Sequence, residues 1–340
     1  MKILFIFIFI LCHGAIASEI DSFNIDIKTL KDASPLLNSE VNHSIQLAIK
    51  ESMEAYSDTC NKKSLVNILK KKLAREGISH HEHFAMESDL IDKVDRRKSK
   101  SIYRNFSFKE MSLVYIYPRA MGKTINLDGH LVGTDKIGHF FAEGFLYYNN
   151  YFKKGRELKE ALIFAADVHE GFLAARFTGV ISYGDLVANF NGYRFWSQIF
   201  KDNSDLLNET DTAYIYCKEN KWIQNRQFRW DSFVDSGWDE SRNCSKLFSQ
   251  TEVDKVKKHL NKVELAKCHS PATVESLQSR YGEYYKYLIN DEGISLYGPN
   301  DVHMPKTFWQ RVNQSLSWGA NTAEWPGIKY ILSTIFFNRS

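Results

Sequence analysis

Charged and polar side chains interrupt an otherwise apolar helical stretch between residues 134 and 196, and this interruption constrains the fold more than any other feature. The stretch opens with Thr134-Asp135-Lys136-Ile137-Gly138-His139-Phe140 and closes with Ser182-Tyr183-Gly184-Asp185-Leu186-Val187-Ala188-Asn189 and the residues to Trp196. A buried polar group is costly unless it bonds to another group, a ligand or a metal. We therefore expect helices whose polar residues face one another at a functional site.

The first predicted helix begins at Thr134, which can act as its N-cap. Asp135, His139 and Glu143 follow at i, i+4 and i+8, a spacing that places them in one stripe on a helix. Lys136 is adjacent and could lie beside this stripe. Gly138 and Gly144 are poor helix formers, which indicates close approach of another backbone.

Two further helices are predicted after the first. One runs from about Glu157 to Arg176 and carries Asp167 and Glu170 on one face. The other opens with Ser182 and Asp185, spaced as in a capping box, and places Asp185 and Asn189 on one face. Because short turns join the helices, we expect antiparallel neighbours with converging polar stripes.

A metal site is the first interpretation of these stripes. Histidine and carboxylates on facing helices suit zinc, manganese or iron, and a divalent metal ion could supply the water activation that a hydrolase needs. No H-E-x-x-H signature accompanies them. The candidate ligands are Asp135, His139, Glu143, Asp167 and Glu170, with Asp185 close to them.

Two other interpretations stay open. In one, His139 paired with Asp135 or Asp185 is a general acid or base, and Lys136 or Asn189 stabilises an anionic oxygen. No G-x-S-x-G nucleophile signature supports a covalent mechanism. In the other, Asp135 and Asp185 cap helices while His139, Asn189 and Glu170 satisfy one another and specify the packing.

The amino-terminal residues predict export. Met1-Lys2, an apolar run from Ile3 to Leu11 and the small residues Ala15-Ile16-Ala17 are typical of a secretory signal peptide cleaved after Ala17. Disulfides are then permitted among Cys60, Cys217, Cys244 and Cys268, and three pairings are open. We expect a bridge within the last three rather than one that reaches Cys60.

The predicted regions are a signal peptide (1–17), an N-terminal helical region with a charged linker (18–100), a central helical region with the candidate site (101–200) and a C-terminal region (213–340), which could pack on the centre as one domain. Within the second, His80-His81-Glu82-His83 is interpreted as part of a solvated linker. Residues 118–133 are predicted to form a loop because Gly122, Gly129 and Gly133 are turn formers. Ala213–Cys217 and Lys221–Ile223 are predicted to form a hairpin.

Two motifs resemble known proteins. The D-K-x-x-H-F and S-Y-x-D-L-x-A-N-x-x-G segments are similar to a group of uncharacterised bacterial exported proteins, and more distantly to the VanZ-like membrane proteins. The matching positions are Asp135, Lys136, His139, Asp185, Asn189 and Gly192. The resemblance implies a bacterial envelope setting.

Together these patterns predict a mainly α protein with a central antiparallel helical bundle and a smaller C-terminal region of short strands and helices. Its predicted location is the periplasm or cell envelope of a bacterium. The partner is left open, and peripheral association with a membrane or the envelope is one candidate. The net charge of +3, from 44 basic and 41 acidic residues, gives no reason to expect a nucleic acid partner. We expect a hydrolase or metal-assisted enzyme acting on a lipid or cell-wall component, or alternatively a non-catalytic scaffold or binding protein.

Overall fold

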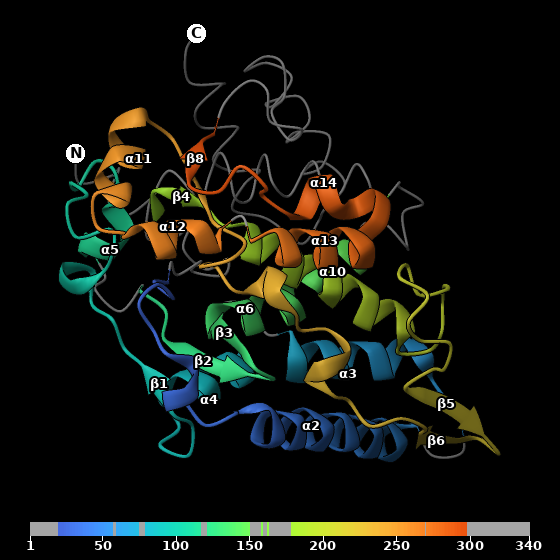
Figure 1. The fold of residues 1–340 in the computed structure, drawn as a ribbon. Helices are drawn as coiled ribbons and strands as arrows, with labels where there is room; N and C mark the ends of the chain where they lie inside the picture. Colours follow the sequence, from blue (N-terminus) through green and yellow to red (C-terminus); the bar gives the residue numbers. More distant parts are fainter. Residues whose placement is uncertain are drawn as a thin grey trace, which may run out of the picture.

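Helices form most of the regular structure, as predicted (Figure 1). This computed structural model describes residues 20–56, 59–74, 79–116, 121–149, 158, 162, 178–268 and 270–297. The α-helices in these residues are α2 (Ser34–Ala55), α3 (Lys62–Leu73), α4 (His80–Glu87), α5 (Ser112–Ile116), α6 (Asp135–Gly138), α7 (Gly144–Tyr147), α10 (Tyr183–Gln198), α11 (Gln250–Lys257), α12 (Lys262–Lys267), α13 (Pro271–Tyr281) and α14 (Tyr285–Leu288). The shorter helical turns are η1 (Ile27–Thr29), η2 (Lys98–Lys100), η4 (His139–Glu143), η7 (Trp230–Ser232), η8 (Ser236–Trp238) and η9 (Gly282–Tyr284).

Helices α2 and α3 pack together along one side of the molecule (Figure 1). Helix α2 buries Leu37, Val41 and Ile45 at fourfold spacing, and α3 buries Leu65 and Leu69 in the same way. This periodicity places one apolar face of each helix toward the core. The helical prediction for this part of the chain is confirmed.

The predicted solvated linker around His80 is wrong, because this segment forms α4. Ser79 caps the helix, and its hydroxyl accepts a hydrogen bond from the backbone N–H of Glu82 at 3.1 Å. His81 and Glu82 are buried, at 0% and 5% exposure. The sequence Ser79-x-x-Glu82 is a helix-start pattern, and it outweighs the polar composition of the segment.

The predicted loop over residues 118–133 is also wrong, since strands β2 (Thr124–Leu127) and β3 (His130–Gly133) form a hairpin. Asp128 and Gly129 both have positive φ, 53° and 82°, as the two central residues of a type I′ turn require. Strand β1 (Lys93–Val94) pairs antiparallel with β2 on its other edge. The hairpin delivers the chain directly to the start of α6.

Two further small sheets lie in the second half of the chain. Strands β5 (Ile215–Lys218) and β6 (Lys221–Gln224) form the predicted hairpin. Strand β7 (Lys246–Leu247) pairs antiparallel with β4 (Val180–Ile181) and parallel with β8 (Ser295–Leu296). The β4–β7–β8 sheet therefore ties the start of α10 to the C-terminal region.

The two central helical segments that can be described run side by side. The first comprises α6, the π-helical turn η4 and α7, and the second is α10. A Cβ added at Gly144 would lie 2.5 Å from the backbone of Gly192, and one added at Gly192 would overlap the carbonyl of Phe140. Close backbone approach at Gly144 is thus confirmed. Most residues of the second predicted helix, including Asp167 and Glu170, lie outside the described residues.

A buried aromatic cluster supports these two helices. The Phe140 ring lies 5.5 Å from Phe195 of α10, 5.0 Å from Trp230 and 5.1 Å from Phe233, measured between centroids. Such pairs add to the free energy gained by burying apolar area. The same apolar core contains residues of α2, α3, α10, the segment 214–238 and α13, so the central helices are held from several sides.

Two disulfides cross-link the chain. Cys244 pairs with Cys268, which confirms a bridge within the last three cysteines. Cys60 pairs with Cys217, so a bridge that the sequence favoured less than one within the last three forms as well. The reason is spatial, because α2 packs on both α3, which follows Cys60, and β6, the partner of the strand that carries Cys217. Within the described ranges, no helix is both long and apolar enough to cross a bilayer.

Candidate functional site

The start of α10 is fixed by Ser182, as the sequence predicts. Its Oγ accepts a hydrogen bond from the backbone N–H of Asp185 at 3.2 Å and donates one to Glu240 Oε1 at 2.6 Å. The Asp185 carboxylate contacts Lys136 instead of closing a capping box. Only the Ser182 half of the predicted capping box therefore forms, and the carboxylate of Asp185 lies in the candidate site.

Thr134 does not cap α6, contrary to prediction. Its hydroxyl accepts a hydrogen bond from the backbone N–H of Lys123 at 3.4 Å, in the hairpin connection. Asp135 Oδ2 lies 2.8 Å from Lys136 Nζ. Helix capping therefore does not account for the buried carboxylate of Asp135.

Lys136 is completely buried and lies among three carboxylates. Its Nζ is 2.8 Å from Asp135 Oδ2, 2.5 Å from Asp185 Oδ1 and 2.6 Å from Glu240 Oε1. One ammonium thus faces three acidic groups that are each no more than 3% exposed. We call Asp135, Lys136, His139, Asp185 and Glu240 the Lys136 cluster.

His139 joins the two central helices. Its Nδ1 lies 3.1 Å from Asn189 Oδ1, and its Nε2 lies 3.4 Å from Asp185 Oδ2. The atom of Asn189 that faces His139 is its amide oxygen, which can only accept, while Asn189 Nδ2 donates to the Tyr147 hydroxyl at 3.4 Å. Nδ1 is therefore the donor in the first contact, and Nε2 is directed at the carboxylate.

Asp135, His139 and Asp185 lie close enough together to hold a metal ion. One ligand atom from each lies within 4.8 Å of the others, and all three residues are buried. Asp135 Oδ1 and Glu240 Oε2 are buried and make no hydrogen bond to any described residue. Three of the predicted site residues thus come together from two helices, with Lys136 and Asn189 in contact with them.

The remaining predicted ligands do not join this group. Glu143 is buried, at 5% exposure, but lies outside the Asp135, His139 and Asp185 set. The reason is η4, because a π turn has more residues per turn than an α-helix and breaks the i, i+4, i+8 stripe. Asp167 and Glu170 lie outside the described residues.

Two acidic residues near the site, Glu240 and Glu82, were not predicted from the sequence. Glu240 follows η8, where no helical or strand period marks it. It also lines a cavity of about 10 Å³ with Ser245, enough for about one water molecule. Glu82 lies against Gly138, where an added Cβ would overlap its carboxylate. The pattern Ser79-x-x-Glu82 was the signal that could have placed Glu82 on a helix.

Burial governs the protonation of these carboxyl groups. It raises the pKa of Asp135 against the opposing charge of Lys136. It also raises the pKa of Glu240 to about 7, and it raises the pKa of Glu82 well above the usual range, with the charge of Asp135 acting in the same direction. Among the described residues, one lysine ammonium is thus surrounded by three buried carboxyl groups.

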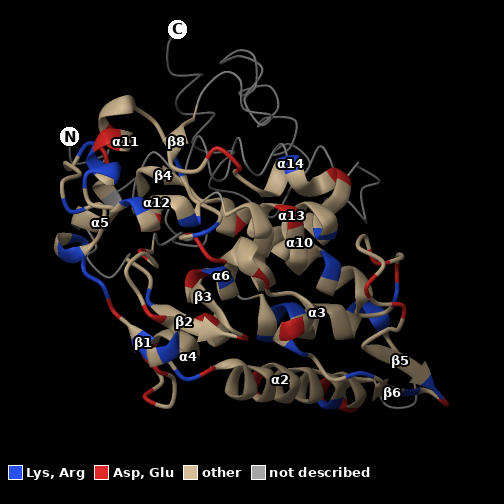
Figure 2. Ribbon diagram, in the orientation of Figure 1, with Lys and Arg blue, Asp and Glu red and all other residues tan. Residues whose placement is uncertain are grey.

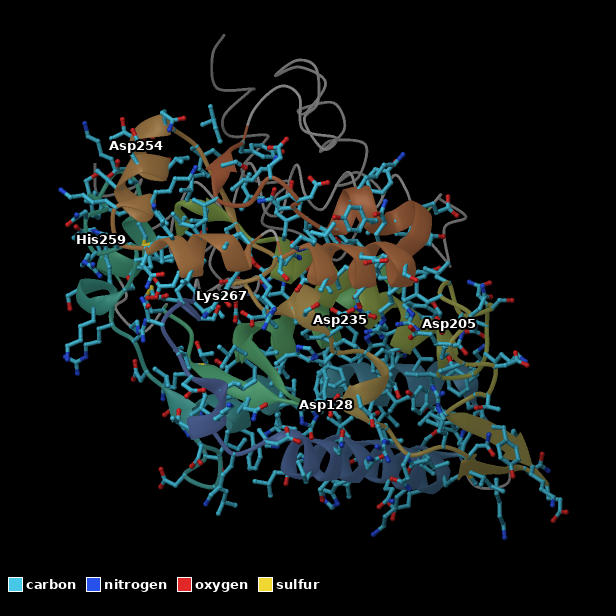
Figure 3. The ribbon with its side chains drawn as sticks, viewed as in Figure 1. Asp128, Asp205, Asp235, Asp254, His259 and Lys267 are labelled. Carbon is cyan, nitrogen blue, oxygen red and sulfur yellow. A yellow bond between two sulfur atoms is a disulfide. The ribbon has the colours of Figure 1, made fainter. Side chains whose placement is uncertain are left out.

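A second buried charged cluster lies on the later half of α10. Arg194 donates from Nε to Asp205 Oδ1 and from Nη2 to Asp205 Oδ2, both at 2.7 Å. It also contacts Asn191 Oδ1 at 2.7 Å and Glu209 Oε2 at 2.8 Å. We call these four residues the Arg194 cluster; Figure 3 labels Asp205 beside the chain that follows α10.

Comparisons with known proteins add no relative. No protein-family model, no curated protein and no solved structure matches this chain. The chemistry of the site therefore rests on its own residues.

Proposed function

We propose that Asp135, His139 and Asp185 bind a divalent metal ion, and that the protein is an exported hydrolase acting on a lipid or cell-wall component. The observation that carries this proposal is the 3.4 Å separation of His139 Nε2 and Asp185 Oδ2. A charge-assisted hydrogen bond is shorter, about 2.7–2.9 Å. Two ligands at about 2.1 Å from one tetrahedral ion are about 3.4 Å apart.

The surrounding residues suit such a site. Asn189 accepts from Nδ1 of His139, and an outer hydrogen bond of this kind orients a metal-binding imidazole so that its other nitrogen faces the ion. Lys136 contacts one oxygen each of Asp135 and Asp185, which positions the carboxylates. A bound divalent ion would activate water and polarise the scissile group. Glu240 and Glu82, whose pKa values are raised, are suited to donate or accept a proton.

The envelope setting belongs to the same proposal. The two disulfides fit an oxidising compartment, and the predicted signal peptide lies outside the described residues. The motifs similar to VanZ-like proteins support the same setting. We also propose that the second predicted helix completes an antiparallel bundle with the two described helical segments.

Metal titration tests the proposal. We expect the chelator-treated, disulfide-bonded protein to bind one Zn²⁺ or Mn²⁺ per chain by calorimetry, and its unfolding temperature to rise with metal. Asp185→Asn and His139→Ala should abolish both effects. Asp205→Asn, which disturbs the other buried cluster, should lower stability yet retain binding. Hydrolysis of phospholipids and cell-wall fragments is then measured with and without metal.

The alternative is a non-catalytic protein in which the cluster only holds the helices together. Its supporting observation is that every member of the Lys136 cluster is at most 5% exposed. This alternative predicts no metal binding, no chelator effect and a large stability loss in both site variants. Absence of metal with normal stability in both variants would contradict the metal site and the packing role, leaving His139 as a general acid or base.

A further inference from the structure

A strongly basic surface lies outside the Lys136 cluster. Residues 95–115 and 254–259 together contain nine basic and three acidic residues, a net charge of +6, whereas the whole chain carries +3. The rest of the chain is therefore net negative, and positive charge is concentrated in two short segments. Figure 2 shows blue segments gathered on the side that carries α5 and α11.

Contacts between side chains join the two segments into one surface. Arg104 Nη2 lies 2.6 Å from His259 Nδ1, and Asn105 Nδ2 lies 2.8 Å from His259 Nε2. Figure 3 labels His259 at this junction. Lys255 neutralises Glu110 through an ion pair of 2.7 Å. The charge of Glu110, one of the three acidic residues in these segments, is thus compensated.

Exposed aromatic rings lie among these basic residues. Phe108 and Tyr115 are 51% and 47% exposed, and their rings meet edge to face with centroids 6.0 Å apart. Lys98 Nζ lies 4.4 Å from the centroid of Tyr115. The Tyr115 hydroxyl donates to the backbone oxygen of Phe106 at 2.7 Å, which fixes the ring in this position.

We propose that this basic–aromatic surface, formed by Arg97, Lys98, Lys100, Arg104, Phe108, Lys109 and Tyr115 with Lys257 and Lys258 beside them, binds a membrane surface rich in anionic lipids. Basic side chains are attracted to lipid phosphates, and aromatic rings partition to the interface between headgroups and acyl chains. The edge-to-face rings, one of them beneath an ammonium, are poorly placed to stack on nucleic acid bases. This proposal does not depend on the metal site.

Vesicle cosedimentation tests it. We expect the disulfide-bonded protein to bind vesicles of phosphatidylcholine with phosphatidylglycerol, to bind pure phosphatidylcholine at least tenfold more weakly, and to dissociate at high salt. Lys100 and Lys109 are exposed and form no ion pair with another described residue, so Lys100→Glu with Lys109→Glu should weaken binding at least tenfold without unfolding. Phe108→Ser should weaken binding about threefold or more, because it removes the apolar contribution.

Two controls separate this surface from net charge and from general hydrophobicity. Lys63→Glu with Lys71→Glu changes two exposed lysines of α3 by the same charge and should leave binding unchanged. Leu90→Ala removes another exposed apolar side chain and should also have no effect. Equal binding to both vesicle types, equal loss in the α3 variant, or binding to an oligonucleotide but not to vesicles would each overturn the proposal.

Discussion

Helix α10 contributes Asp185 to the Lys136 cluster and Arg194 to the Arg194 cluster, and the two clusters differ in the pKa values of their described carboxyl groups. Arg194 forms a bidentate pair with Asp205, and Asp205 also accepts hydrogen bonds from the backbone N–H groups of Glu209 and Thr210 at 3.1 Å. Although burial opposes it, Arg194 lowers the pKa of Asp205. In the Lys136 cluster the pKa values of Asp135 and Glu240 are raised instead. A carboxylate held charged by an arginine specifies packing, whereas buried carboxyl groups with raised pKa values favour an added cation or proton.

The largest difference is expected when each cluster loses its cation. Arg194→Met leaves Asp205 charged and held by backbone donors, so we expect a loss of about 3–5 kcal/mol in unfolding free energy at both pH 5.5 and pH 8. Lys136→Met leaves carboxyl groups that can take up protons, so its loss should be clearly smaller at pH 5.5 than at pH 8. Urea unfolding at the two pH values measures both. Losses of equal size and equal pH dependence would remove the distinction between the clusters.

The pH dependence of stability gives a second, smaller contrast. The pKa of Glu240 rises from 4.5 to about 7 on folding, so the folded state holds its proton more tightly. Its stabilising contribution is complete below about pH 4.5 and is lost as the pH rises through about 7, a change on the order of 3 kcal/mol. Glu240→Gln should flatten this part of the profile. Asp205, whose pKa is lowered, has the opposite sign: its stabilising contribution is lost as the pH falls, so Asp205→Asn should flatten the acidic part of the profile.

The smallest effect is expected at Glu82. Burial and the charge of Asp135 raise the pKa of this carboxyl well above the usual range, which favours the protonated form, and that form resembles a glutamine in charge and shape. We expect Glu82→Gln to change the unfolding free energy by less than about 1 kcal/mol at pH 7. Asp205→Asn, measured beside it by urea unfolding, should cost several times more. A large loss in Glu82→Gln would show that Glu82 is charged in the folded protein.

The sequence predicted the central contacts better than the periphery of the site. The spacing of Asp135 and His139, and of Asp185 and Asn189, follows directly from helical periodicity, and the structure brings these residues together. Glu143 was misplaced because no pattern in the residues distinguishes a π turn from an α turn. Helical periodicity thus predicts which residues share a helix face over about one turn. Beyond that turn, tertiary packing decides which residues lie on the same face.

Glu240 and Asp205 could not be assigned from local patterns. Glu240 reaches Lys136 across more than one hundred residues of sequence, and Asp205 lies in a polar segment that resembles an exposed boundary. The helical position of Glu82 could have been predicted, because the Ser79-x-x-Glu82 capping pattern predicts a helix. The Asp128-Gly129 pair likewise marked the hairpin that was interpreted as a loop. In both segments, turn and helix-cap chemistry determines the structure more strongly than polar composition does.

The disulfide connectivity has a consequence for biosynthesis. Among Cys60, Cys217, Cys244 and Cys268, each cysteine pairs with its next neighbour along the chain. A chain that enters an oxidising compartment amino end first therefore presents partners in the order in which they must join. Both bridges can close as the thiols emerge, without thiol–disulfide exchange to correct earlier pairings. We therefore expect an oxidase alone to be sufficient for correct pairing, without a disulfide isomerase.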